Sequence, residues 1–241
     1  NQSRRQRQMC IRDSISIGAV SLVWYRMVLA TAVLALFMGI KRISFALSTK
    51  QFYIMLICGV LIALHWVFFF HAVKLSNVSV TLSVMSAGAL VTALVEPIFY
   101  KRSFVWYEIV LGLIVVIALG LIMQTEYHYI EGIMFAFFAI LLSVAFTLIN
   151  GKAIHKSDAR VMSVYQLGAG AICMSVIILM QGKFTVEFFS ISNTDILWIS
   201  ILAIVCTAYA FVVSIAVMRH LTPFSLMLAI NMEPVLSLIH I

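Results

Sequence analysis

Charged residues are scarce in this sequence of 241 residues, since Asp, Glu, Lys and Arg make up 10% of it while 63% is hydrophobic. An ordinary soluble domain is about 25% charged and about 45–50% apolar. So few charges cannot cover the surface of a soluble protein of this size. The sequence therefore predicts an integral membrane protein in a lipid bilayer. Its apolar residues form continuous runs, which favours helices over a β-barrel.

The sequence also lacks the patterns of common catalytic and metal sites. Its four cysteines are scattered, without metal-ligand spacing or a disulfide framework. None of the motifs G-x-S-x-G, H-E-x-x-H and G-x-x-x-x-G-K-[ST] occurs. We therefore expect no metal, no cofactor and no enzymatic activity. The formal net charge of the chain is +7. In a membrane protein an excess of Lys and Arg is typical of the cytoplasmic loops, so this charge does not indicate a nucleic-acid partner, and we expect none.

Apolar runs of about 20 residues indicate transmembrane helices. Eight such runs are present, and they predict an all-α, polytopic membrane helix bundle. The predicted helices cover residues 15–40, 52–73, 78–99, 104–123, 130–150, 161–180, 196–218 and 222–241.

Successive loops alternate between many and few basic residues. One set of loops carries nine of them: Lys41, Arg42, Lys50, Lys101, Arg102, Lys152, Lys156, Arg160 and Arg219. The opposite set carries only Lys74 and Lys183. Cytoplasmic loops are enriched in Lys and Arg, so the first set is predicted to face the cytoplasm. The expected location is the bacterial cytoplasmic (inner) membrane, crossed several times.

The N-terminus contradicts this orientation, because it places four arginines outside: Arg4, Arg5, Arg7 and Arg12. The stretch RQRQMCIRDS at 5–14 resembles a translated sequencing adapter, and LSLIHI at 236–241 resembles its matching tail. We expect residues 1–14 and 236–241 to be non-native and exclude them from the fold prediction. The alternative is a basic cytoplasmic tail on an eight-helix protein, which would invert the whole loop pattern.

Two stretches of the sequence resemble each other, HAVKLSNVSVTLSVMSAGALVTAL at 71–94 and AVMRHLTPFSLMLAINMEPVLSL at 216–238. Each begins with the end of an apolar helix and a basic residue, continues through a short polar turn, and enters a new apolar helix. Aligning Lys74 with Arg219 places the two stretches on opposite sides of the membrane. A similar unit in opposite orientations is typical of an inverted repeat.

Three segments carry a resemblance to a known family: WYRMVLAT at 24–31, ALHWVFFFHAVKLSNVSVT at 63–81 and SLMLAINMEPVL at 225–236. They resemble the EamA-type permeases of the drug/metabolite transporter superfamily. The resemblance implies ten helices in two inverted repeats of five. On that basis 15–123 holds helices two to five, 130–235 holds helices six to nine, and the first and tenth are missing.

A transporter of this kind needs a few polar groups near the middle of the membrane. Glu233, followed by Pro234, lies near the middle of its predicted helix and is the first candidate for proton coupling or for binding an amine. Its alternative is a neutral glutamic acid that packs two helices. Asn231 is a weaker candidate on a different face.

Further candidates lie on other helices. His65, followed by Trp66, is in mid-helix and could titrate, or it could make a helix–helix hydrogen bond. Arg26 could hold a substrate carboxylate at the cavity mouth, or extend to the interface like the aromatic residues beside it. Tyr209 is expected near mid-depth and could hydrogen-bond substrate. Asn150 and Gln166 lie nearer the cytoplasmic end.

A second Glu–Pro pair occurs at Glu96. With Lys74 aligned to Arg219, Glu233 matches Gly88, so Glu96 is not its counterpart. Glu96 is expected at the cytoplasmic end of its helix, extending to the interface or paired with Lys101 or Arg102.

The sequence therefore predicts a secondary transporter for a small polar metabolite, such as an amino acid or related compound. It would work by alternating access with a coupling proton, and no oligomeric state is predicted. Two alternatives stay open. An intramembrane enzyme would use His65 and Glu233 as acid and base, and a non-transporting membrane scaffold would have no central cavity.

Overall fold

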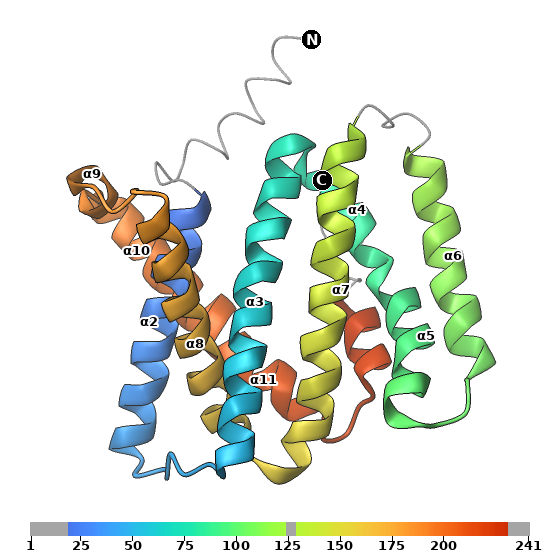
Figure 1. The fold of residues 1–241 in the computed structure, drawn as a ribbon, viewed down its shortest axis with the longest axis horizontal. Helices are drawn as coiled ribbons and strands as arrows, with labels where there is room; N and C mark the ends of the chain where they lie inside the picture. Colours follow the sequence, from blue (N-terminus) through green and yellow to red (C-terminus); the bar gives the residue numbers. More distant parts are fainter. Residues whose placement is uncertain (1–18, 124–128, 231–241) are drawn as a thin grey trace.

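The computed structural model describes residues 19–123 and 129–230, and these residues form a bundle of helices (Figure 1). The long helices are α2 (Ala19–Ile40), α3 (Thr49–Leu75), α6 (Trp106–Met123), α7 (Ile130–Ala153) and α8 (Ala159–Met180). The shorter ones are α4 (Val78–Ser86), α5 (Gly88–Tyr100), α9 (Val186–Phe189), α10 (Asn193–Ile201) and α11 (Ala210–Val217). A π-helix, η3 (Leu202–Tyr209), joins α10 to α11, a 3₁₀ turn, η2 (Ile154–Lys156), follows α7, and a further helix occupies 223–230.

The prediction of an all-α, polytopic membrane bundle is confirmed. Six helical stretches are long and apolar enough to cross a membrane: Val20–Ile40, Thr49–Leu75, Val78–Tyr100, Ile130–Lys156, Ala159–Met180 and Thr194–Val217. A shorter apolar helix, Trp106–Ile117, lies within α6. The division into two inverted repeats stays a prediction, as does the non-native character of 1–14 and 236–241, which lie outside the described residues.

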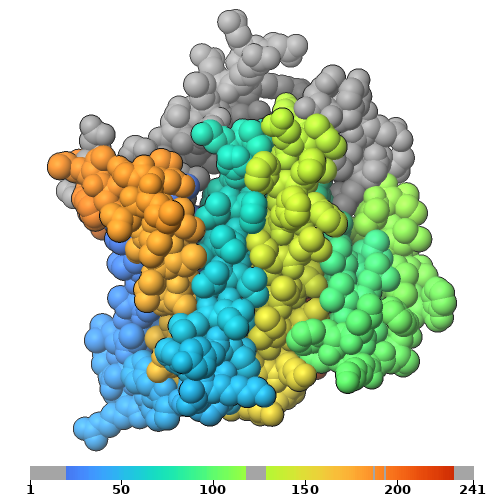
Figure 2. Space-filling model, viewed as in Figure 1, coloured from blue at the N-terminus to red at the C-terminus, as the bar shows by residue number. Residues whose placement is uncertain are grey.

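The helices are arranged in a row of neighbours. Helix α8 packs against α2 and α3, α3 packs against α7, α7 packs against α4 and α5, and α6 packs against α5. Helix α2 also packs along η3. The space-filling view shows α3 and α7 side by side at the centre of one face (Figure 2). Segments from both halves of the sequence therefore meet in one core.

Small residues allow α3 and α8 to approach closely. A Cβ atom added to Gly59 would lie 2.6 Å from the Cβ of Ala169, and one added to Gly170 would lie 3.2 Å from the carbonyl oxygen of Gly59. Such contacts between small residues are a common basis of helix association in membranes.

Two predicted helices are interrupted. The helix expected over 78–99 divides at Ala87 into α4 and α5, although Val78–Tyr100 still forms one membrane-length stretch. The helix expected over 196–218 contains the π-helix η3. Both interruptions keep the apolar pattern of a helix, and this explains why the sequence predicted continuous ones.

One end of the bundle gathers the basic loops, and we call it the basic end. There the Nε2 of Gln51 donates to the carbonyl of Lys156 at 2.9 Å, and the Nη2 of Arg219 donates to the carbonyl of Ser157 at 3.0 Å. These bonds join the start of α3, the α7–α8 connection and the turn after α11. The basic end is the end predicted to face the cytoplasm.

Candidate functional site

The candidate site centres on Arg26 of α2, which meets side chains of α3 and η3. The guanidinium carbon of Arg26 lies 4.8 Å from the centre of the Trp66 ring. Its Nε donates a hydrogen bond to the hydroxyl oxygen of Thr207 at 3.1 Å. A cation over an indole face gains about 2 kcal/mol when both groups are desolvated. The sequence named Arg26 and Trp66 as candidates, and the structure brings them together.

Arg26 lies deeper than the cavity mouth where we expected it. Trp66 is about 14 Å from the Leu75 end of α3, at 1.5 Å per residue. Thr207 lies in the middle of the stretch Thr194–Val217. The long Arg26 side chain reaches partners inside the spans of α3 and η3, and it is only partly exposed.

The π-helix positions Thr207 for this contact. The Thr207 hydroxyl donates to the carbonyl of Leu202 at 3.0 Å, five residues earlier, while the same oxygen accepts from Arg26. Short π-helical segments often occur at functional sites. Sequence reasoning missed Thr207, and the signal that could have found it is a hydroxyl within the apolar run IVCTAYA at 204–210.

Among the residues whose side chains the structure describes, Arg26 forms no salt bridge. The salt bridges found there join Arg102 to Glu96 and Glu108, and Arg160 to Asp158. A guanidinium has five N–H groups, and the one on Nε is used toward Thr207. A cation inside a membrane span is costly without a partner. The arrangement therefore suits an anionic partner.

His65 makes the helix–helix hydrogen bond that was its structural alternative. Its Nδ1 lies 2.8 Å from the carbonyl oxygen of Ala139 in α7. A carbonyl only accepts, so Nδ1 carries the proton. The ring also stacks near Phe69 and contacts Phe146 edge-on. His65 thus links α3 to α7, and no hydrogen bond or ring contact joins it to Arg26 in the described part of the chain.

Asn150 and Gln166 form a reciprocal amide pair between α7 and α8. The Gln166 Nε2 donates to Asn150 Oδ1 at 2.6 Å, and the Asn150 Nδ2 donates to Gln166 Oε1 at 3.1 Å. Gln166 Nε2 also lies 3.0 Å from the sulfur of Met55 in α3. Both amides are buried. A buried pair that satisfies itself stabilises helix packing and leaves little capacity for substrate.

The remaining candidates stay predictions. Tyr209 is 68% exposed and so faces away from the core of the bundle. Glu233 and Asn231 lie outside the described residues. In the described ranges no group of three or more His, Cys, Asp or Glu side chains is placed to hold a metal ion.

The predicted pairing of Glu96 with Arg102 is confirmed. The Nη2 of Arg102 lies 3.1 Å from Glu96 Oε1 and 2.9 Å from Glu108 Oε2. Glu96 is 2% exposed and Glu108 is 3% exposed, so one arginine serves two buried carboxylates at the basic end. Sequence reasoning missed Glu108 in this cluster, although it stands six residues after Arg102 in the first turn of α6.

Comparison with known proteins gives one family match. Residues 11–124 match the family model of the EamA-like transporter family. No curated protein matches the chain, and no solved structure matches it either. The match covers the region that holds Arg26, Trp66, His65 and Glu96.

Proposed function

We propose that this chain, whose residues 11–124 match the model of the EamA-like transporter family, is a secondary transporter that moves a small polar metabolite by alternating access. The family match over residues 11–124 and the six membrane-length helical stretches support a membrane transporter. The class of substrate, the coupling and the membrane of residence are parts of the proposal.

The environment of Arg26 is the observation that supports a substrate with a carboxylate group. Its guanidinium is held between Trp66 and Thr207, within the spans of three helices, and it forms no salt bridge with any side chain that the structure describes. Arginine binds carboxylates through paired hydrogen bonds. A metabolite with a carboxylate, such as an amino acid, would supply the missing negative charge. The indole and the hydroxyl would keep the guanidinium oriented between transport cycles.

Coupling to protons through Glu233 is the second part of the proposal. It is supported by the sequence, which places a carboxylate beside a proline within an apolar run. The bacterial cytoplasmic membrane is the expected site, with the basic end inside.

Uptake by the full chain in proteoliposomes tests the role of Arg26. Single radiolabelled amino acids and their decarboxylated amines would serve as paired substrates. We expect uptake of at least one amino acid, no uptake of its amine, and a loss of about 10- to 100-fold in Arg26→Gln, since a hydrogen bond to a charged group contributes about 1.5–3 kcal/mol. Arg26→Lys should retain part of the activity.

Arg42→Gln is the matched control, because Arg42 is exposed in the turn after α2. Equal losses in both variants, or full activity in Arg26→Gln, would reject the role of Arg26. Uptake under an imposed pH gradient tests the coupling separately. Gradient-driven uptake that survives Glu233→Gln would reject Glu233 as the proton site and leave the carboxylate site standing.

A further inference from the structure

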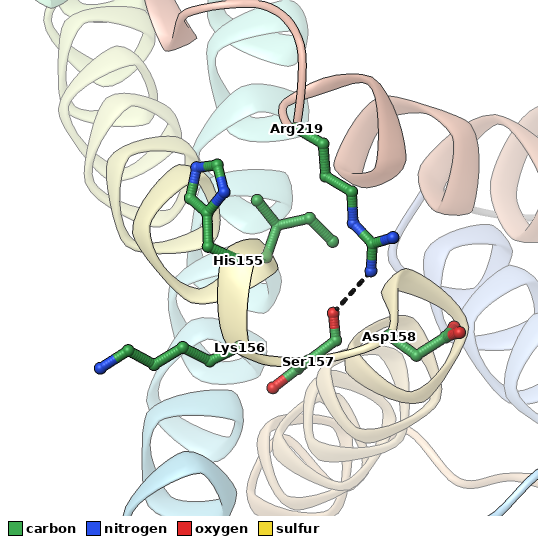
Figure 3. Close-up of a pocket in the computed structure, with 6 residues that line it drawn as sticks. His155, Lys156, Ser157, Asp158 and Arg219 are labelled. Atoms are coloured by element: carbon green, nitrogen blue, oxygen red, sulfur yellow. Dashed lines mark hydrogen bonds between the residues drawn. The ribbon is translucent and has the colours of Figure 1, made fainter.

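Two adjoining pockets open at the basic end, and they share His155 and Arg219. The first has a volume of about 480 Å³ and lies between the α7–α8 connection and the turn after α11 (Figure 3). The second has a volume of about 420 Å³ and also reaches Glu96, Lys152 and His220. Together they form one hollow, which is lined by residues from 151–158 and 218–223 and, in the second pocket, by Glu96 and Tyr100 of α5.

Basic side chains from both segments surround this hollow. Arg219 comes from the turn after α11, and His155 and Lys156 come from the turn η2. Figure 3 shows the guanidinium of Arg219 lying across the pocket, where its Nη2 donates to the Ser157 carbonyl at 3.0 Å. The Lys156 side chain extends away from Arg219, and the His155 ring stands opposite Arg219. The bond to Ser157 holds the guanidinium in place while other N–H groups of its fork stay accessible, since Arg219 is exposed.

The acidic residues that line the hollow are already paired with other arginines. Asp158 accepts from Arg160 Nε at 2.9 Å and from its Nη2 at 2.6 Å. Glu96 is bonded to Arg102 and to the backbone N–H of Phe224. None of the salt bridges within 19–123 and 129–230 involves Arg219, Lys156 or Lys152. The hollow therefore carries a net positive charge, although Arg219 also attracts the nearby Asp158 carboxylate.

The hollow lies where the membrane spans end. Lys156 closes the stretch Ile130–Lys156, and Arg219 follows Thr194–Val217 by two residues. This is the level of lipid headgroups, and basic pockets between helices on this side bind phosphate-bearing headgroups. Guanidinium groups favour phosphate because the fork matches two of its oxygens.

We propose that this hollow is a binding site for a phosphate group, with Arg219 and His155 as its direct ligands and Lys152, Lys156 and His220 adding positive potential. The phosphate belongs to an anionic lipid headgroup or to a free phosphate ion. The site is separate from Arg26 and does not depend on the proposed transport function.

Thermal unfolding of the full chain in detergent tests this site, because a ligand that binds only the folded state raises the melting temperature. The chain would be titrated with phosphatidylglycerol, with diacylglycerol of the same acyl chains, with inorganic phosphate, and with chloride at equal ionic strength. We expect a saturable rise in Tm with one of the phosphate compounds and none with diacylglycerol or chloride. Arg219→Gln should raise the half-saturating concentration about tenfold, in line with the loss of a charged hydrogen-bond donor.

Two further variants separate binding from folding. His155→Gln should also weaken binding, and His155 has no hydrogen bond to another described residue, so the unliganded Tm should not change. Lys50→Gln removes an exposed charge at the same end, outside both pockets, and should change the half-saturating concentration less than about twofold.

Comparison of the titrations with phosphatidylglycerol and with inorganic phosphate shows whether the bound phosphate belongs to a lipid or is a free ion. Saturation by phosphatidylglycerol but not by inorganic phosphate identifies a lipid headgroup site, and saturation by inorganic phosphate alone identifies a free-phosphate site. The proposal is overturned if diacylglycerol has the same effect, if Lys50→Gln weakens binding as much as Arg219→Gln, or if neither pocket variant changes the response.

Discussion

Glu96 caps the helix that begins at residue 223, because its Oε2 accepts a hydrogen bond from the backbone N–H of Phe224 at 2.9 Å. Its other oxygen accepts from Arg102 at 3.1 Å. A carboxylate at a helix N-terminus satisfies an unpaired N–H and interacts favourably with the helix dipole. One carboxylate of the first half therefore fixes the start of the helical run in which Glu233 is predicted to lie.

Removal of this cap is expected to destabilise the protein. Glu96→Ala leaves the Phe224 N–H and the buried side of Arg102 without their partner, and should cost about 2 kcal/mol of unfolding free energy. This is below the usual cost for a broken buried ion pair because the Arg102 side chain is 28% exposed. Glu96→Gln keeps an acceptor for Phe224 and should cost less. Thermal unfolding in detergent measures both effects.

Glu131→Ala provides the control for the cap, because Glu131 is an exposed carboxylate in the first turn of α7. Its loss should cost less than about 1 kcal/mol. If Glu96→Ala lowers the melting temperature no more than Glu131→Ala does, the cap does not stabilise the helix at 223–230.

The Glu96 cluster shows which contacts a sequence can predict. Arg102 follows Glu96 by six residues at a helix end, and local spacing predicted that pair. Phe224 is 128 residues away, and no local pattern indicates which helix start a buried carboxylate will meet. The apolar runs predicted the helices because hydrophobic length alone decides where a chain can span a membrane.

The contacts of Arg26 in the candidate site show the same limit of prediction from sequence. The sequence put forward Arg26, and Trp66 beside His65, as candidates on separate helices, but their contact depends on how α2, α3 and η3 pack. The π-helix that positions Thr207 was unpredictable because it has the same apolar pattern as an α-helix. Tyr209 is a candidate for a hydrogen bond to substrate because of its depth, and this role stays a prediction. Depth does not fix which face of a helix is buried, and the Tyr209 side chain is mostly exposed.

Gly59 is expected to be essential for the packing of α3 against α8. A Cβ at this position would collide with the Gln166 carbonyl oxygen and lie 2.6 Å from the Ala169 Cβ. These are backbone and short side-chain atoms that cannot rotate away. Gly59→Ala should therefore lower stability by about 1–3 kcal/mol, as overpacked substitutions do.

Gly39→Ala is the matched control in α2, where a Cβ would meet nothing within 4 Å. Alanine is the better helix former, so this variant should be neutral or more stable by up to about 1 kcal/mol. Differential scanning fluorimetry of the two variants provides the comparison. Similar melting temperatures for both would mean that α3 and α8 can separate at little cost.

The amide pair of Asn150 and Gln166 should show coupling in a double-mutant cycle. Gln166→Leu alone leaves a buried Asn150 amide without its partner, which costs about 1–3 kcal/mol. Replacing both residues by Leu removes the orphaned group. The double variant should therefore be more stable than the sum of the two single losses predicts, by about 0.6–1.7 kcal/mol, as for hydrogen bonds between membrane helices. Additive losses would show that the pair contributes through volume and not through its hydrogen bonds.

Asp158 at the start of α8 should make stability depend on pH in the acid range. Hydrogen bonds from the Arg160 side chain lower the pKa of Asp158 from 3.8 to about 2, against the opposing effect of burial. Because the folded-state pKa is the lower one, the stabilisation is complete above the unfolded pKa of 3.8. It is lost as the pH falls toward 2. The carboxylate is 36% exposed, so the ion pair contributes no more than about 1 kcal/mol.

Asp158→Asn isolates this effect, because asparagine still caps the helix through the backbone N–H of Arg160 but does not titrate. The wild type should melt at a higher temperature than Asp158→Asn near neutral pH. The difference should shrink between about pH 4 and about pH 2, since every other acid is common to both chains. A difference in melting temperature that stays constant over this interval would mean that Arg160 stabilises the helix start without an ion pair to Asp158.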